Sequence, residues 1–319
     1  MKKFCLLGMI LLIMLSYSAM AETEQTGYTT SVPAAYKAAS SQPGTVEELT
    51  YDSLDYVRDE APVRKTAFVY LPYGYDANDT ETRYNIVYLM HGWGGHAGEY
   101  FDYTATKNVF DHMIENGDIE PMIFVSATFY NENSDTDFSS SIEEFRAFHL
   151  DFENHLMPAV EGKYHTWSEG TTPEDFAASR DHRAFGGFSM GSVTTWYQFL
   201  NALDEVRYFL PFSGDCWVLQ QMGGRNRSAD TAAYLAEHAS GSEYKDAFYI
   251  YAMTGGDDIA YDAMNGQIAA MRESDVFRFG IAPAEGNISF GVLDGATHDY
   301  TYYRNYIYSA LMAIWPATK

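Results

Sequence analysis

Residues 187–191 read Gly-Phe-Ser-Met-Gly and follow an apolar run that ends at Phe188. A segment with helical spacing follows them, so the G-x-S-x-G motif lies in the strand, turn and helix context that exposes a nucleophilic serine. The two glycines remove side chains that would clash around a strained turn. The motif therefore predicts that Ser189 attacks an acyl group, and the alternative is an ordinary Gly/Ser turn.

A serine hydroxyl needs a neighbouring base to take its proton near neutral pH. The chain has nine histidines. In the expected chain order, the histidine comes after the serine and the acid, in a loop that follows the last strand. Only His298 has this place, after the predicted strand 288–293. We therefore predict His298 as the general base, and we expect packing or surface roles for histidines such as His91 and His96.

Several aspartates could orient the imidazole of His298. Asp257 and Asp258 both follow the predicted strand 248–254, which is the next-to-last one and the usual source of this acid. The other candidates are Asp215, Asp294 and Asp299. The residues alone favour the pair at 257 and 258 and do not choose between its members.

A second glycine-rich turn, His-Gly-Trp-Gly-Gly at 91–95, follows another apolar run. Such a turn lets backbone amides approach the oxyanion of a tetrahedral intermediate. We predict that the Trp93 amide is one donor and that the Met190 amide, directly after Ser189, is the other. The alternative, a nucleotide loop, lacks both G-x-G-x-x-G and a G-K-[ST] ending.

The chain is unusually aromatic, with 26 Tyr, 20 Phe and 5 Trp. Most of these side chains are expected to pack the core, including the tyrosines between Tyr300 and Tyr308. Trp217 differs because it follows a predicted strand close to the predicted site, where its ring could stack on a planar acyl group or a sugar. Neither H-E-x-x-H nor C-x-x-C occurs in the sequence, so no metal and no cofactor is predicted.

Short β-rich runs alternate with helical patterns along the chain. The predicted strands are Thr66–Leu71, Asn85–Met90, Met122–Ala127, Ala184–Phe188, Tyr208–Phe212, Phe248–Thr254 and Ile288–Leu293. Helical spacing is clearest at residues 145–160, 193–203 and 303–314. This alternation predicts an α/β fold with a mostly parallel central sheet and helices on both faces, whose reactive groups gather at the carboxyl ends of the strands.

The first 21 residues have a basic start, an apolar core and the small-x-small ending Ala19-Met20-Ala21, which predicts a signal peptide at 1–21. Residues 22–45 are rich in Ser, Thr and Pro and are expected to be an N-terminal segment or linker, followed by one domain at 46–319. We expect a secreted or periplasmic protein. The net charge of −24 argues against binding to nucleic acid or to an anionic membrane.

From about Leu49 onward, the chain resembles the bacterial feruloyl esterases of carbohydrate esterase family one. The resemblance rests on residues 187–197, on Ser-Gly-Asp with Trp217, on the block Thr-Gly-Gly-Asp-Asp-Ile-Ala-Tyr at 254–261, and on Gly-Ala-Thr-His at 295–298. It implies a single domain of the α/β-hydrolase fold. Within the third block it implies that the second acidic residue, Asp258, is the acid of the triad, and it implies that Trp217 lines the acyl pocket.

The resemblance also implies a substrate, because enzymes of this family cleave ferulate esters from the arabinose side chains of xylan. We therefore expect a secreted serine esterase that acts on feruloylated arabinoxylan or its oligosaccharides. One alternative is an acetylxylan esterase or another short-acyl carbohydrate esterase. A second alternative, of another class, is a non-catalytic glycan-binding protein on a hydrolase fold.

Overall fold

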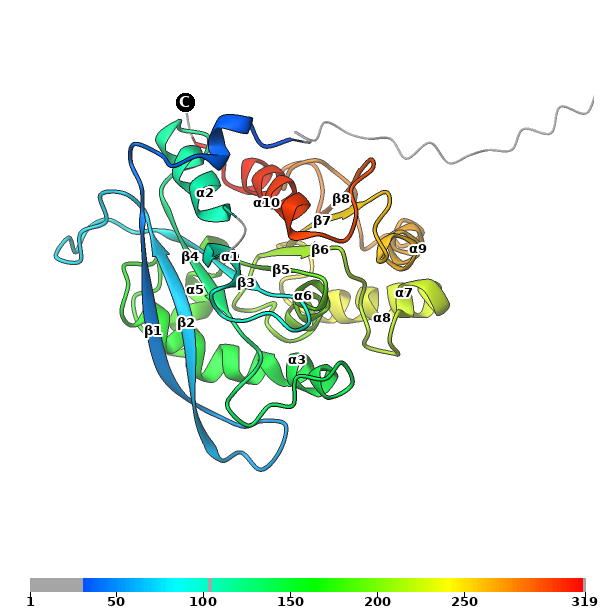
Figure 1. Cartoon of the computed structure of the whole chain (residues 1–319). Coiled ribbons are helices and arrows are strands. Elements are labelled where there is room, and N and C mark those ends of the chain that lie inside the picture. The colour runs from blue at the N-terminus through cyan, green and yellow to red at the C-terminus, as the bar shows by residue number, and fades with distance from the viewer. Residues whose placement is uncertain (1–30, 103–104, 318–319) are drawn as a thin grey trace, which may run out of the picture.

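The computed structural model describes residues 31–102 and 105–317. These residues form one eight-stranded sheet with the order β1-β2-β4-β3-β5-β6-β7-β8 (Figure 1). The strands are β1 (Thr45–Leu54), β2 (Pro62–Leu71), β3 (Asn85–Met90), β4 (Met122–Ala127), β5 (Arg183–Phe188), β6 (Tyr208–Phe212), β7 (Tyr249–Gly255) and β8 (Ile288–Leu293). β1 and β2 form an antiparallel pair, and β2 is antiparallel to β4. The other six strands, β3 to β8, all run parallel to one another. The predicted α/β class is confirmed.

Helices cover both faces of this sheet (Figure 1). On one face lie α1 (Glu99–Asp102), α2 (Thr106–Glu115) and α10 (Tyr300–Ile314). The other face carries α3 (Ser140–Asp151), the π-helix Phe152–Leu156, α4 (Met157–Glu161), α6 (Met190–Asn201), α8 (Ser228–Gly241) and α9 (Tyr261–Met271). Shorter helices are α5 (Pro173–Ala178), α7 (Gly223–Asn226) and the 3-10 turns Ala34–Lys37 and Arg180–His182.

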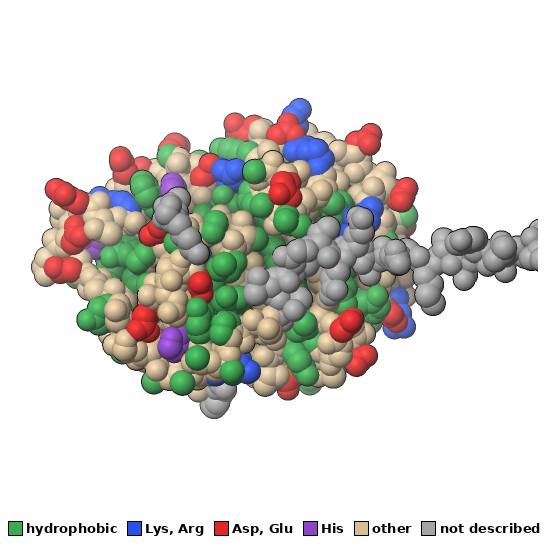
Figure 2. Space-filling view, turned by 90° about the horizontal axis from the view of Figure 1, so that it is seen from above, with side chains coloured by type: hydrophobic (Ala, Val, Ile, Leu, Met, Phe, Trp, Pro, Cys, Tyr) green, Lys and Arg blue, Asp and Glu red, His purple; other side chains and the backbone are tan. Residues whose placement is uncertain are grey.

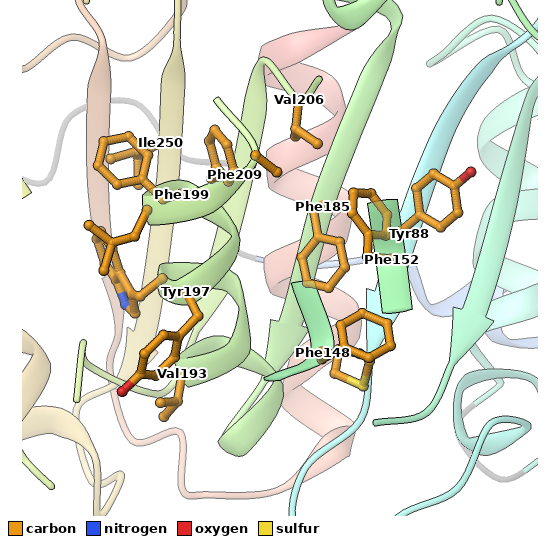
Figure 3. Close-up of a cluster of buried hydrophobic side chains, with 14 of the residues drawn as sticks. Tyr88, Phe148, Phe152, Phe185, Val193, Tyr197, Phe199, Val206, Phe209 and Ile250 are labelled. Atoms are coloured by element: carbon orange, nitrogen blue, oxygen red, sulfur yellow. The ribbon is translucent and has the colours of Figure 1, made fainter. Parts of the chain in front are cut away.

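The central strands form because they are buried on both faces. Every residue of β4, β5, β6 and β7 is buried, and such strands read as nearly continuous apolar runs. Against β5, Phe185 packs with Phe148 and Phe152 of the long helical segment, while Tyr197 and Phe199 of α6 lie nearby (Figure 3). This packing sets β5 and α6 on either side of the turn that carries Ser189.

The edge strand β1 was not predicted from the sequence. Its ten residues include only two buried ones, since it is paired on one side only and most of its side chains meet water. An edge strand of this kind lacks the apolar run that identifies the central strands.

The packed part of the chain also begins earlier than the predicted domain start at residue 46. The Val32 amide donates to Asn305 Oδ1 at 2.9 Å, and the Tyr36 hydroxyl donates to Asp118 at 2.7 Å. Gly44 then donates its amide to the buried Asp111 at 2.8 Å. Within the predicted segment 22–45, residues from Val32 onward therefore contact α2 and α10 and do not form a free linker.

The predicted signal peptide at 1–21 lies outside the described residues. Among the helices that the structure does describe, none combines the length and the apolar character needed to cross a bilayer. Asp and Glu side chains are scattered over the face shown in Figure 2, with Lys and Arg between them. The strong negative charge of the chain is therefore not gathered into one patch on that face.

Candidate active site

Ser189 occupies the sharp turn between β5 and α6. Its backbone lies at φ 60° and ψ −117°, a region that non-glycine residues rarely adopt, and the strand-to-helix reversal requires this conformation. A Cβ on Gly187 or on Gly191 would overlap the carbonyl oxygen of Met90 on β3. The two glycines of the motif are therefore needed because the turn passes directly over a neighbouring strand.

Ser189, His298 and Asp258 form one chain of hydrogen bonds. His298 Nε2 lies 2.8 Å from Ser189 Oγ, and His298 Nδ1 lies 2.7 Å from Asp258 Oδ1. Because a carboxylate can only accept, Nδ1 carries the hydrogen, so Nε2 of the neutral imidazole is free to accept the serine proton. This is the arrangement of a serine triad.

The sheet topology brings these three residues together. Ser189 follows β5, Asp258 follows β7 and His298 follows β8, so all three lie at the carboxyl ends of parallel strands. Asp258 Oδ1 also accepts the Ala260 amide at 2.7 Å, which fixes the carboxylate.

The other predicted acids lie elsewhere. Asp257 is exposed and Asp258 is buried, so the structure separates the two residues that the sequence left as alternatives. Asp299 caps α10 by accepting the Thr301 amide at 2.7 Å. Asp294 is exposed and has no hydrogen bond to His298 within the described residues. Asp215 is buried beside Trp217.

Two side-chain contacts fix the glycine-rich turn after β3. The carbonyl oxygen of Gly92 accepts from His91 Nδ1 at 2.6 Å and from the Gly95 amide at 3.2 Å. The other nitrogen of His91, Nε2, accepts from Thr128 Oγ1 at 2.7 Å. Burial lowers the pKa of His91 to about 4, so the ring stays neutral at ordinary pH and both nitrogens are satisfied.

This arrangement orients the Trp93 amide. The Gly92 carbonyl and the Trp93 amide belong to one trans peptide, in which the two groups point in opposite directions. Holding the carbonyl on His91 therefore directs the Trp93 N–H to the other side of the turn. Gly92 lies against Ser189, since a Cβ on Gly92 would be 3.1 Å from Ser189 Cβ. Within the described residues, neither the Trp93 amide nor the Met190 amide donates to a protein acceptor.

Trp217 is held in place by a buried carboxylate. Its indole N–H donates to Asp215 Oδ1 at 2.9 Å, and Asp215 Oδ2 accepts the Gly224 amide at 2.7 Å. Burial raises the pKa of Asp215. The Trp217 ring lies 6.2 Å from that of Phe138, which in turn lies 5.6 Å from the exposed ring of Trp93. The rings of Trp93, Phe138 and Trp217 thus form a continuous aromatic cluster.

Three residues that shape this site were not predicted to do so from the sequence. His91 and Thr128 hold the glycine-rich turn, and the hydroxyl of Tyr300 accepts the Gly92 amide at 2.6 Å. The position of His91 directly before the glycines was the one available signal. Thr128 and Tyr300 gave none, because their contacts join segments that are distant in sequence.

No group of three or more His, Cys, Asp or Glu side chains suited to a metal ion occurs within residues 31–102 and 105–317. Burial raises the pKa of the Cys216 thiol to about 12, so this cysteine stays protonated and unreactive at ordinary pH.

Comparison with known sequences identifies related proteins. The model of a family described as "Putative esterase" matches residues 61–314. Endo-1,4-beta-xylanase Y of Acetivibrio thermocellus is 41% identical over 281 residues, which are 88% of this chain and 24% of that protein. An endo-1,4-beta-xylanase/feruloyl esterase of Xylanibacter ruminicola is 28% identical over 185 residues, which are 56% of this chain and 23% of that protein. The chain thus spans about a quarter of the length of these curated relatives.

Solved structures give a similar result. A mutant of the feruloyl esterase module from Clostridium thermocellum, complexed with sinapinate, has 40% identity and a TM-score of 0.77, covering 90% of this chain and 95% of that chain. A ferulic acid esterase from Anaeromyces mucronatus in complex with ferulic acid has 17% identity and a TM-score of 0.64, covering 90% and 97%. The second likeness concerns the fold alone.

Proposed function

This chain belongs to the esterase family, and we propose that it is a serine esterase that hydrolyses ferulate esters on plant cell-wall xylan. The observation that carries the proposal is the hydrogen-bonded chain of Ser189, His298 and Asp258. The 40% identity to a feruloyl esterase module, over 95% of that module, supports a hydroxycinnamate as the acyl group. The predicted signal peptide and a polysaccharide substrate both support action outside the cytoplasm.

In the proposed reaction, Ser189 Oγ attacks the ester carbonyl carbon while its proton passes to His298 Nε2. The carbonyl oxygen becomes an oxyanion and accepts from the amides of Trp93 and Met190. Asp258 keeps Nδ1–H in place and stabilises the imidazolium that forms. His298 then gives the proton to the departing sugar oxygen, which leaves the acyl group on Ser189.

Water completes the cycle. His298 takes a proton from the water as its oxygen attacks the acyl carbonyl, and a second oxyanion forms between the same two amides. When this intermediate collapses, the bond to Ser189 Oγ breaks and His298 returns the proton to the serine. The products are the hydroxycinnamic acid and the free sugar hydroxyl. Trp217 is proposed to line the acyl pocket, where its ring would contact the aromatic acid.

The test compares wild-type protein and Ser189→Ala on methyl ferulate and on 4-nitrophenyl acetate. We expect ferulate release from the wild type and a loss of more than about 1,000-fold in kcat for the variant, as is usual when a triad serine is removed. If the wild type cleaves only the acetate, the triad assignment stands, but the enzyme acts on short acyl groups and not on ferulate. Undiminished activity in a folded Ser189→Ala would contradict the mechanism.

A further inference from the structure

Tyr300, two residues after His298, makes a hydrogen bond to the glycine-rich turn that follows β3. Its hydroxyl oxygen accepts the Gly92 amide at 2.6 Å, across 208 residues of sequence. We propose that Tyr300 is a positioning residue that, together with His91, orients the Trp93 amide toward the oxyanion. The proposal rests on the proposed esterase function and adds a residue to it.

The fold holds the Tyr300 side chain in one place. Tyr300 is the first residue of α10, whose start is fixed by the Asp299 side chain accepting the Thr301 amide at 2.7 Å. The ring of Tyr300 lies 4.8 Å from that of Phe188 and 5.8 Å from that of Tyr100. Burial raises the pKa of the phenol, so Tyr300 stays neutral at ordinary pH.

Two side chains together fix two successive peptide planes of the turn. Tyr300 binds the N–H of Gly92, which belongs to the peptide between His91 and Gly92. His91 binds the carbonyl of Gly92, which belongs to the next peptide, the one that carries the Trp93 N–H. Glycine has wide conformational freedom, so Gly92 alone would let either plane rotate. With both planes held, the Trp93 amide has one direction.

The contact also lies directly beside the nucleophile. A Cβ placed on Gly92 would be 3.1 Å from Ser189 Cβ and 3.3 Å from the Tyr300 hydroxyl oxygen. The ring of Phe188, the residue before Ser189, lies 4.7 Å from His298 and 4.8 Å from Tyr300. Tyr303 and Tyr306, farther along α10, are fully buried in the core, as expected from the sequence. Tyr300 differs from them because its hydroxyl binds the backbone of the proposed oxyanion site.

Tyr300→Phe tests this role because it removes the acceptor and keeps the ring. The control is Tyr302→Phe, which removes the hydroxyl of a partly buried tyrosine on the same helix. We expect Tyr300→Phe to lower kcat by about 10- to 100-fold on both methyl ferulate and 4-nitrophenyl acetate, since a misplaced donor weakens transition-state binding for any acyl group. KM should change by less than about threefold, and Tyr302→Phe should resemble the wild type.

A second measurement separates positioning from general damage to the fold. A trifluoromethyl ketone forms a tetrahedral adduct with Ser189, so its inhibition constant should rise in Tyr300→Phe by about the factor that kcat/KM loses. Binding of 2-methoxy-4-vinylphenol, which keeps the aromatic ring of ferulate but lacks the carboxylate that could accept from the oxyanion amides, should remain within about threefold of the wild type. Parallel losses in the binding of this phenol and of the inhibitor would mean a structural role and would overturn the proposal.

If the wild type is active and Tyr300→Phe has an unchanged kcat, the proposed positioning role of Tyr300 is also overturned. If the wild-type protein hydrolyses neither ester, the proposed function itself fails, and this outcome is distinct from an active enzyme that tolerates Tyr300→Phe.

Discussion

The buried carboxylate of Asp215 binds the indole N–H of Trp217 through one oxygen, at 2.9 Å, and the Gly224 amide through the other, at 2.7 Å. Asp215 thereby ties the start of α7 to the ring that is proposed to receive the acyl group. A carboxylate suits this place because both of its oxygens accept. An asparagine side chain has one accepting oxygen and a donating NH₂ group, so it could satisfy only one of the two donors.

Asp215→Asn is therefore expected to damage recognition of the aromatic acid more than the chemistry at Ser189. Loss of one hydrogen bond to a charged group is typically worth about 1.5–3 kcal/mol. We predict a fall of roughly tenfold or more in kcat/KM on methyl ferulate, and of less than about threefold on 4-nitrophenyl acetate, whose acyl group is too small to need Trp217. Equal losses on both esters would show that Asp215 does not act through the acyl pocket.

Asp257 and Asp258 provide a matched pair for the triad acid, because they are adjacent and one is exposed while the other binds His298. Asp258→Asn places an amide beside Nδ1 and favours the wrong tautomer of the imidazole. We expect kcat to fall by about 10⁴-fold, as in other serine triads. Asp257→Asn makes the same charge change and should stay within about threefold of the wild type. Steady-state kinetics on methyl ferulate would check both, and a large loss in Asp257→Asn would contradict the assignment.

The sequence predicted the parts of the site that are local. Ser189 and the glycines around it lie within five residues of sequence, and their geometry follows from the turn that those residues must make. His298 was predictable from chain order, because the fold has few ways to bring a histidine to a serine. Asp258 needed the resemblance, since two adjacent carboxylates give the same pattern and only their burial differs.

The sequence could not predict contacts between distant segments. Tyr300 and Gly92 meet only because α10, which packs against β6 and β7, begins beside the turn that follows β3, and a tyrosine in a run of tyrosines reads as a core residue. Asp215 looked like a possible triad acid because it follows a strand, whereas its carboxylate is used by Trp217 and Gly224. β1 was missed because an edge strand exposes most of its side chains.

The strand that leads to Ser189, β5, begins at a buried ion pair. Arg183, the first residue of β5, binds Glu161 through Nε at 2.7 Å and through a second nitrogen at 2.8 Å, and both side chains are almost fully buried. Arg183→Met would leave the Glu161 carboxylate without its partner. We expect a loss of about 3–5 kcal/mol in the free energy of unfolding, measured by urea denaturation.

The exposed pair of Arg278 and Asp246, at 3.2 Å, is the control, and Arg278→Met should cost less than about 1 kcal/mol. The double variant Arg183→Met with Glu161→Met should be more stable than Arg183→Met alone, because no unpaired charge remains buried. If the double variant is less stable than the single one, lost packing, and not the unpaired Glu161 carboxylate, accounts for the loss in the free energy of unfolding.

Glu153 and Glu205 make stability depend on pH. Glu153 Oε1 and Glu205 Oε2 are buried without a hydrogen-bond partner, and neither residue has an ion pair within the described residues. Burial, together with nearby negative charge, raises the pKa of Glu153 to about 8 and that of Glu205 to about 7, from an ordinary value of 4.5. The folded protein therefore binds these protons more tightly than the unfolded chain, so their contribution to stability is lost as pH rises from about 4.5 to about 8.

Glu153→Gln keeps the shape of the side chain and removes its titration. We expect the variant to gain Tm relative to the wild type at pH 8, and to gain little at pH 5, where Glu153 of the wild type is already protonated when folded.

The neutral His91 acts in the opposite sense, because its lowered pKa costs stability as pH falls from 6.5 toward about 4. The difference in Tm between variant and wild type removes that contribution, since both proteins keep His91. Glu273→Gln, at an exposed glutamate on the surface, should show no change in this difference between pH 5 and pH 8. If the gain from Glu153→Gln were the same at both pH values, the buried carboxyl would not be the titrating group.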